Sequence, residues 1–178
     1  DLSSKNFGPG DVTLLAAWIR RPEVSAVLTR VSVLSNPIGA DGAGALIEVF
    51  EQNTNLRTLL GIEEGVTEVN LSKKNVDPGQ AKILAAELKA SRATAVLTTL
   101  RCGSNPGMVG ELYSSGNLKT PDVHIEALQE LLNALKPSGV TELDISAIGI
   151  GPTGADHVTN YIRNARAALA SVNLGQIS

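Results

Sequence analysis

The sequence of 178 residues has little cysteine, few aromatic side chains and no long hydrophobic run. Its one cysteine, Cys102, cannot form a disulfide within the chain, which favours an intracellular reducing compartment. One Trp, two Tyr and two Phe are too few for the stacked aromatic platforms that bind single-stranded nucleic acid. Since no apolar run approaches the roughly 20 residues of a membrane-spanning helix, we expect no membrane-spanning segment.

Positive charge is also scarce, with 15 Lys and Arg against 18 Asp and Glu. The net charge of −3 argues against a nucleic-acid partner, because nucleic-acid-binding proteins are usually basic. The two histidines, His124 and His157, have no cysteine or carboxylate cluster around them, so the sequence predicts no metal site. No spacing indicates a nucleophile with its base. We therefore expect a protein that is not an enzyme and needs no cofactor.

What the chain does contain is an internal repeat. Residues 1–37 return 69 residues later as residues 70–106, with 16 identities in 37 aligned positions and no gap. A third, weaker copy begins at Asp144. Self-similarity at a fixed period is the sequence signature of stacked repeat architectures, in which each unit buries its apolar face against its neighbours.

Within the copies, short alternating segments predict strands, and segments with apolar residues at i, i+3, i+4 and i+7 predict helices. Asp77-Pro78, Gly8-Pro9 and Gly151-Pro152 mark expected helix starts. The expected strand positions are Leu2; Leu28, Val31, Val33; Val66, Val69, Leu71; Leu97, Leu100, Cys102; Val140, Leu143, Ile145; and Leu169, Val172, Leu174. The expected helix stripes are Val12, Leu15, Ala16, Ile19; Ala43, Leu46, Phe50; Ala81, Leu84, Ala85, Leu88; Leu128, Leu131, Leu132, Leu135; and Ala155, Val158, Ile162.

Residues 28–46, LTRVSVLSNPIGADGAGAL, resemble the LxxLxLxxNxIxxxGxxxL pattern of leucine-rich repeats of the ribonuclease-inhibitor-like type. The resemblance covers essentially the whole chain and implies an α/β solenoid of five to six repeats, with the parallel sheet inside and the helices outside. It also implies a binding function, since such solenoids mainly serve as surfaces for unrelated protein partners. The family's interior asparagine corresponds to Asn36 and Asn105, where its side chain would satisfy backbone groups at the turn.

Two segments interrupt the repeat. Residues 55–65 form an extended return, where Leu56 and Leu59 are expected to make an extra turn. Residues 107–121 form an inserted loop that we expect to lie outside the repeating core. Residues 1–178 are otherwise expected to form a single domain. Because the chain begins and stops at expected strands without polar caps, we expect either a longer protein or another subunit to cover its ends.

The concave face of the sheet is the first candidate for partner binding. Neighbouring parallel strands lie about 4.8 Å apart, so equivalent outward residues form rows across the sheet. These rows place Arg30 beside Glu68 and Arg101 beside Asp144. The face is either a charged docking surface or a set of charges that neutralise one another. Its candidate contact residues are Arg30, Glu68, Asn70, Arg101, Glu142 and Asp144.

The inserted loop is the second candidate. It carries Met108, Leu112, Tyr113 and Leu118 among glycines and serines, which indicates apolar anchors on a flexible stem. The alternative is that these side chains fold back and cover the flank of the repeats. The expected function is that of a non-catalytic protein–protein interaction scaffold. The alternatives are a structural subunit of a larger multiprotein assembly and a regulator of an enzyme such as a small GTPase.

Overall fold

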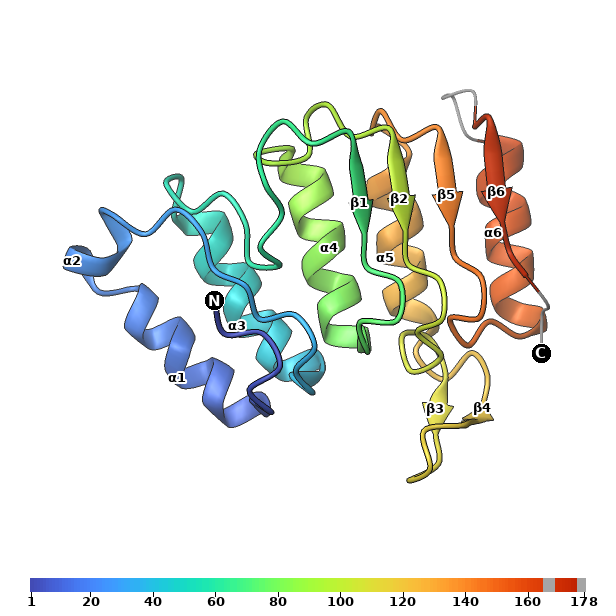
Figure 1. Ribbon diagram of the computed structural model, residues 1–178, viewed down its shortest axis with the longest axis horizontal. Helices are drawn as coiled ribbons and strands as arrows, with labels where there is room; N and C mark the ends of the chain where they lie inside the picture. Colours follow the sequence, from blue (N-terminus) through green and yellow to red (C-terminus); the bar gives the residue numbers. More distant parts are fainter. Residues whose placement is uncertain (165–168, 176–178) are drawn as a thin grey trace.

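The computed structural model describes residues 1–164 and 169–175, whose helices and strands lie in two layers (Figure 1). The helices are α1 (Pro9–Ile19), α2 (Pro22–Ser25), α3 (Gly39–Gln52), α4 (Pro78–Ala90), α5 (Ile125–Leu135) and α6 (Pro152–Asn164). The strands are β1 (Glu68–Asn70), β2 (Thr99–Arg101), β3 (Glu111–Leu112), β4 (Leu118–Thr120), β5 (Glu142–Asp144) and β6 (Ser171–Asn173). No helix in this described part is long and apolar enough to cross a membrane.

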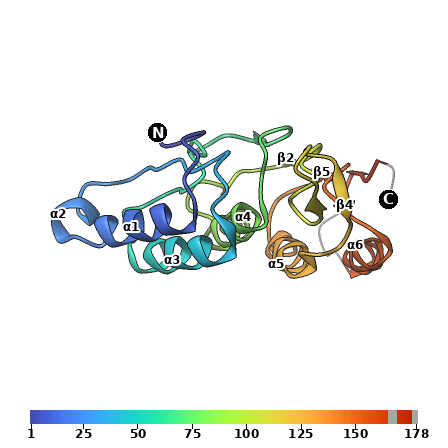
Figure 2. The same cartoon turned by 90° about the horizontal axis from the view of Figure 1, so that it is seen from below.

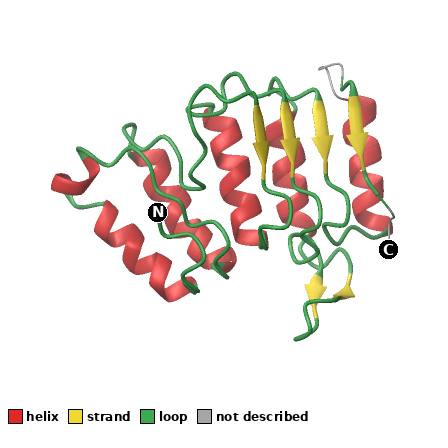
Figure 3. Ribbon diagram, in the orientation of Figure 1, coloured by secondary structure: helices red, strands yellow, loops and turns green. Residues whose placement is uncertain are grey.

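A four-stranded parallel sheet, in the order β1-β2-β5-β6, confirms the expected α/β class (Figure 3). Helices α4, α5 and α6 connect its successive strands and cover one of its faces, as Figure 2 shows from below. The central residues of the strands pair in register and point toward this helix layer: Val69, Leu100, Leu143 and Val172. The short antiparallel pair β3–β4 lies apart from the sheet, between β2 and α5.

Three helices begin where the sequence predicts, at Pro9, Pro78 and Pro152. Proline suits the first helical position, because its missing N–H has no partner within the helix. The Asp77 side chain accepts a hydrogen bond from the Gln80 N–H at 2.7 Å and closes a capping box at α4. At α6 the cap comes from farther away, since Asp122 accepts from the N–H of Gly151 at 2.8 Å.

The expected helix stripes form most of one continuous core. The stripes of α4 and α5 are buried completely, as are Ala43, Leu46 and Phe50 of α3. One stripe was wrong at its end, because α6 turns Tyr161 into the core and leaves Ile162 43% exposed. Cys102 is fully buried at its expected strand position.

Asn36 and Asn105 are buried and hydrogen-bonded to the strand before them in space as well as to their own turn. The Asn105 side chain donates to the carbonyls of Leu71 at 2.9 Å and Cys102 at 2.7 Å, and accepts from the Val76 N–H at 3.1 Å. Asn36 does the same one unit earlier, bonding the backbone of Leu2 at 2.9 Å. Each amide therefore satisfies buried backbone groups that no strand partner reaches.

The sheet is interrupted in the first half of the chain. Residues 30–33 pair with residues 58–60, through bridges at Arg30–Thr58 and Ser32–Leu60. Among the described residues no ladder then joins residues 58–60 to β1. The expected extra turn at Leu56 and Leu59 is therefore an additional strand-like segment, which occupies the place where the sequence put β1.

A buried glutamate of α4 compensates for this interruption. The Glu87 carboxylate accepts from the N–H groups of Leu59 at 2.5 Å and Leu60 at 2.9 Å, and from the Thr58 hydroxyl at 2.9 Å. Glu87 is only 1% exposed, and burial raises its pKa to about 7 despite these hydrogen bonds. The carboxylate thus replaces a missing neighbouring strand as the acceptor for two backbone donors.

We predict that Glu87 makes stability depend on pH. Its pKa is about 7 in the folded protein against an ordinary 4.5 when unfolded, so the folded state holds the proton more tightly. Stability from this group is complete below pH 4.5, falls as the pH rises to about 7, and then levels off. The shift corresponds to a loss of about 3 kcal/mol.

Urea unfolding at pH 5 and pH 8 measures this loss. Glu87→Gln cannot ionise, so its unfolding free energy should change less between the two pH values than that of the wild type. Glu51→Gln, an exposed glutamate on α3, serves as the control and should keep the wild-type slope. Equal slopes for the wild type and Glu87→Gln would show that Glu87 does not titrate in this range.

Candidate binding surface

Five of the predicted partner-binding residues line adjacent strands on the face of the sheet opposite the helices. The strands pair Asn70 with Arg101 and Arg101 with Asp144 in one row, as the sequence predicts. A second row pairs Thr99 with both Glu68 and Glu142. We call this set the polar strip: Glu68, Asn70, Arg101, Glu142 and Asp144.

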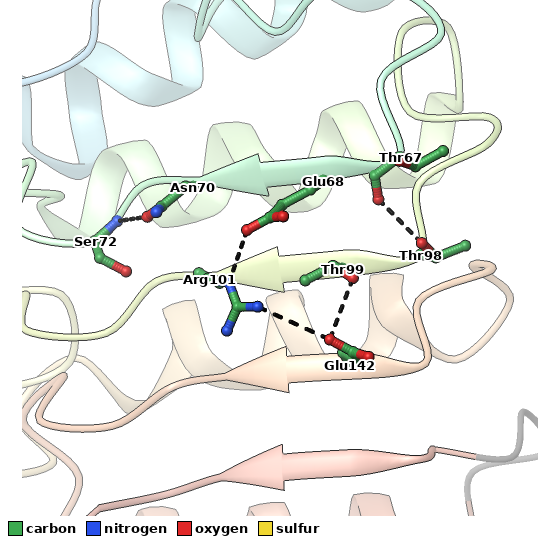
Figure 4. A network of polar contacts seen from close by, with 8 residues as sticks. All are labelled: Thr67, Glu68, Asn70, Ser72, Thr98, Thr99, Arg101 and Glu142. Atoms are coloured by element: carbon green, nitrogen blue, oxygen red, sulfur yellow. Dashed lines mark hydrogen bonds and ion pairs between the residues drawn. The ribbon is translucent and has the colours of Figure 1, made fainter.

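Arg101 is the centre of the polar strip (Figure 4). Its guanidinium donates to the Glu68 carboxylate at 2.8 Å and lies 3.9 Å from that of Glu142. The hydrogen bond to Glu68 and the nearby carboxylates raise the pKa of Arg101 above its ordinary value, so it stays charged. Because these groups are exposed, their pairing is screened by solvent and adds little to stability.

Asp144 is a register partner of Arg101 but does not pair with its guanidinium. One carboxylate oxygen accepts instead from the N–H of Ser146 at 3.0 Å and from its hydroxyl at 2.7 Å. The neighbouring Gly103 leaves room for this arrangement, since a Cβ there would press on both side chains. Asp144 therefore contributes negative charge to the strip without neutralising Arg101.

The predicted neighbourhood of Arg30 was wrong. Arg30 lies on the other side of the sheet interruption, where its backbone bridges Thr58 and its guanidinium is 3.3 Å from Glu63. The additional segment 58–60 separates it from Glu68. The sequence alignment missed this displacement because the extra segment has no counterpart in the second copy of the repeat.

The inserted loop is partly core and partly exposed, so the expectation of four apolar anchors on a flexible stem was wrong. Met108 and the adjacent Val109 are fully buried. Val109 is also tied at both backbone groups: its N–H donates to Ile148 at 3.0 Å, and its carbonyl accepts from His124 at 2.7 Å. The base of the loop therefore belongs to the hydrophobic core.

The rest of the loop is the β3–β4 hairpin, which projects beyond the carboxyl ends of the parallel strands (Figure 1). Glu111 and Lys119 pair across it at 2.8 Å, and Lys119 lowers the pKa of Glu111 by this hydrogen bond. Leu118 is half-buried against Gly110. Leu112 and Tyr113 remain 38% and 56% exposed, so two of the four predicted anchors are available at the hairpin.

The described residues bring together no catalytic or metal-binding group. No cluster of three His, Cys, Asp or Glu suited to a metal ion occurs among them. His157 contacts Gln129 at 2.9 Å. Burial and the charge of Asp144 raise the pKa of the Cys102 thiol to about 12, so it is protonated and unreactive at neutral pH.

Sequence reasoning missed the buried polar residues of α4. Gln80 donates to the carbonyls of Val33 at 3.0 Å and Asn36 at 3.1 Å, and Glu87 holds the interrupted segment. One signal was present in the alignment, where Glu87 corresponds to Trp18. A tryptophan and a glutamate at equivalent positions indicate that the two helices face different neighbours.

No protein-family model matches the chain, and no curated protein matches its sequence. The function is therefore argued from the surfaces just described.

The loop supports a prediction about stability. Met108→Ala should lower the unfolding free energy by about 2–5 kcal/mol, because it removes a fully buried side chain. Tyr113→Ala should change it by less than about 0.5 kcal/mol, because the ring is largely exposed. Urea unfolding of both variants measures the difference. Similar losses in the two variants would mean that the hairpin packs as part of the core.

Proposed function

We propose that this chain is a leucine-rich-repeat solenoid that acts as a non-catalytic protein-binding scaffold. The repeat of 69 residues and the motif at residues 28–46 support the family assignment. The buried Asn36 and Asn105 bond backbone groups at the turns, which is the role that the resemblance gives to the interior asparagine. The parallel sheet with helices along one face is consistent with this architecture.

The observation that carries the binding role is the uncovered face of the sheet. Parallel sheets usually bury both faces under helices. Here the described helices cover one face, and the other presents the polar strip (Figure 2). The β3–β4 hairpin stands at the end of this face and adds Leu112 and Tyr113, residue types that supply anchoring contacts at interfaces.

Affinity capture from native lysate tests the scaffold. Leu112→Ala/Tyr113→Ala should lose the captured partner, because it removes the apolar anchors. Glu68→Lys should weaken capture through the polar strip, an effect that added salt reduces. Val96→Ala removes an apolar side chain that is 51% exposed away from both surfaces and is the control. Capture that neither hairpin nor strip variants alter would contradict the proposal.

A second candidate, a structural subunit of a larger assembly, is favoured by the free side of α1. In the equivalent helix α4, three residues turn toward the preceding part of the chain. Gly79 lies against the Gly39 carbonyl, where a Cβ would collide, and Glu87 bonds the interrupted segment. Ile83, one turn from each, is fully buried. These positions form the contact between neighbouring helices.

The corresponding positions in α1 are open. Nothing lies within 4 Å of a Cβ built on Gly10, and Leu14 and Trp18 are 73% and 45% exposed. Val27 is exposed too, but so is its counterpart Val96, so exposure there is ordinary. An apolar helix face at positions that form contacts elsewhere in the same chain favours a further structural neighbour.

This candidate predicts a change at Trp18, the only tryptophan. In an assembly its fluorescence should shift to shorter wavelength, because the ring leaves water. Leu14→Glu should break the assembly in sedimentation velocity, whereas Val27→Glu should not. A complex that Leu14→Glu leaves intact, with unshifted Trp18 emission, would rule out α1 as the contact.

A further inference from the structure

A groove of ≈ 550 Å³ opens beside the interruption of the sheet. Two arginines line it, Arg30 from the segment paired with residues 58–60 and Arg57 from the start of the additional segment. Two glutamates of the following loop, Glu63 and Glu64, line it as well. We call it the arginine groove, and residues 62–65 the acidic loop.

Each arginine is held by a backbone carbonyl as well as by a carboxylate. Arg57 donates to Glu64 at 3.0 Å and to the carbonyl of Arg92 at 3.2 Å. Arg30 donates to the Gly61 carbonyl and, at 3.3 Å, to Glu63. The carbonyl contacts aim both guanidinium groups independently of the carboxylates, so the pair stays oriented when the carboxylates leave.

The floor of the groove is also fixed in place. Arg92 donates to the carbonyls of Phe50, Asn53 and Leu56 at 2.7, 2.8 and 2.8 Å. Its guanidinium lies 4.3 Å from the centre of the Phe50 ring. These contacts anchor the turn from which Arg57 projects. A rigid site with two aimed cations loses little conformational freedom when it binds an anion.

The carboxylates, by contrast, sit on an exposed segment. The side chains of Glu63 and Glu64 are 69% and 58% exposed, and such ion pairs contribute little against water. Gly65 follows at a φ of 80°, with nothing within 4 Å of a Cβ built there. Gly61 at the other end packs closely on Ser32. Residues 63–65 can therefore lift away while Gly61 keeps its place.

We propose that the arginine groove binds an acidic peptide segment of a partner protein, and that the acidic loop occupies it in the absence of that partner. The loop itself supplies the template, since two consecutive glutamates engage one arginine each. A peptide with adjacent carboxylates makes the same two charge-assisted contacts after displacing them. The groove is separate from the β3–β4 hairpin, so this proposal and the scaffold proposal fail independently.

The test uses a fluorescein-labelled peptide, Gly-Ile-Glu-Glu-Gly, with blocked ends, and measures fluorescence anisotropy on the whole chain. Glu63→Gln/Glu64→Gln should bind it about tenfold more tightly than the wild type, since the competing carboxylates are gone; this corresponds to about 1.4 kcal/mol. Adding Arg30→Gln/Arg57→Gln to that variant should abolish binding. Binding should also weaken with added salt.

Three controls make the outcome decisive. A Gly-Ile-Gln-Gln-Gly peptide should not bind, and Glu51→Gln should behave as the wild type. Circular dichroism melting checks that the variants fold, and Glu63→Gln alone is the milder second variant. Failure of the loop variants to bind more tightly, or retention of binding without the arginines, would overturn the proposal. Inorganic phosphate binding to the groove without peptide binding would overturn the peptide as its ligand.

Discussion

Hydrogen bonding of buried backbone groups is the constraint on which this structure depends. Where a strand ends inside the protein, its N–H and carbonyl groups lose their ladder partners and need others. Asn36 and Asn105 supply them at two turns. Glu87 supplies them where the sheet is interrupted, at the expense of placing a carboxylate in the core. The helices can therefore pack continuously although the sheet does not.

The interruption also divides the exposed charges into two groups. On one side, β1, β2 and β5 carry the polar strip, in which three carboxylates outnumber Arg101. On the other side, Arg30 and Arg57 face the acidic loop. A continuous sheet would have placed Arg30 beside Glu68 and merged the groups. The additional segment 58–60 thus creates a second surface of different chemistry.

The periodic parts of this fold could be predicted from the sequence, and the irregular parts could not. The stripes of α4 and α5 and the row through Arg101 follow from spacings of 3.6 and 2 residues, which local sequence records directly. Met108 has no such period around it, so its burial depends on contacts with distant residues. The displacement of Arg30 likewise depends on a pairing with Thr58 that no repeat position encodes.

The two surfaces constrain a partner in different ways. The polar strip retains an excess of negative charge after Arg101 pairs with Glu68, so it favours basic groups. The arginine groove becomes positive only when the acidic loop leaves it, so it favours acidic groups. Complementary charge mainly sets orientation and the rate of encounter, whereas buried apolar contacts supply most of the affinity. Leu112 and Tyr113 are thus the expected source of affinity, and the opposite charges fix the direction in which a partner lies.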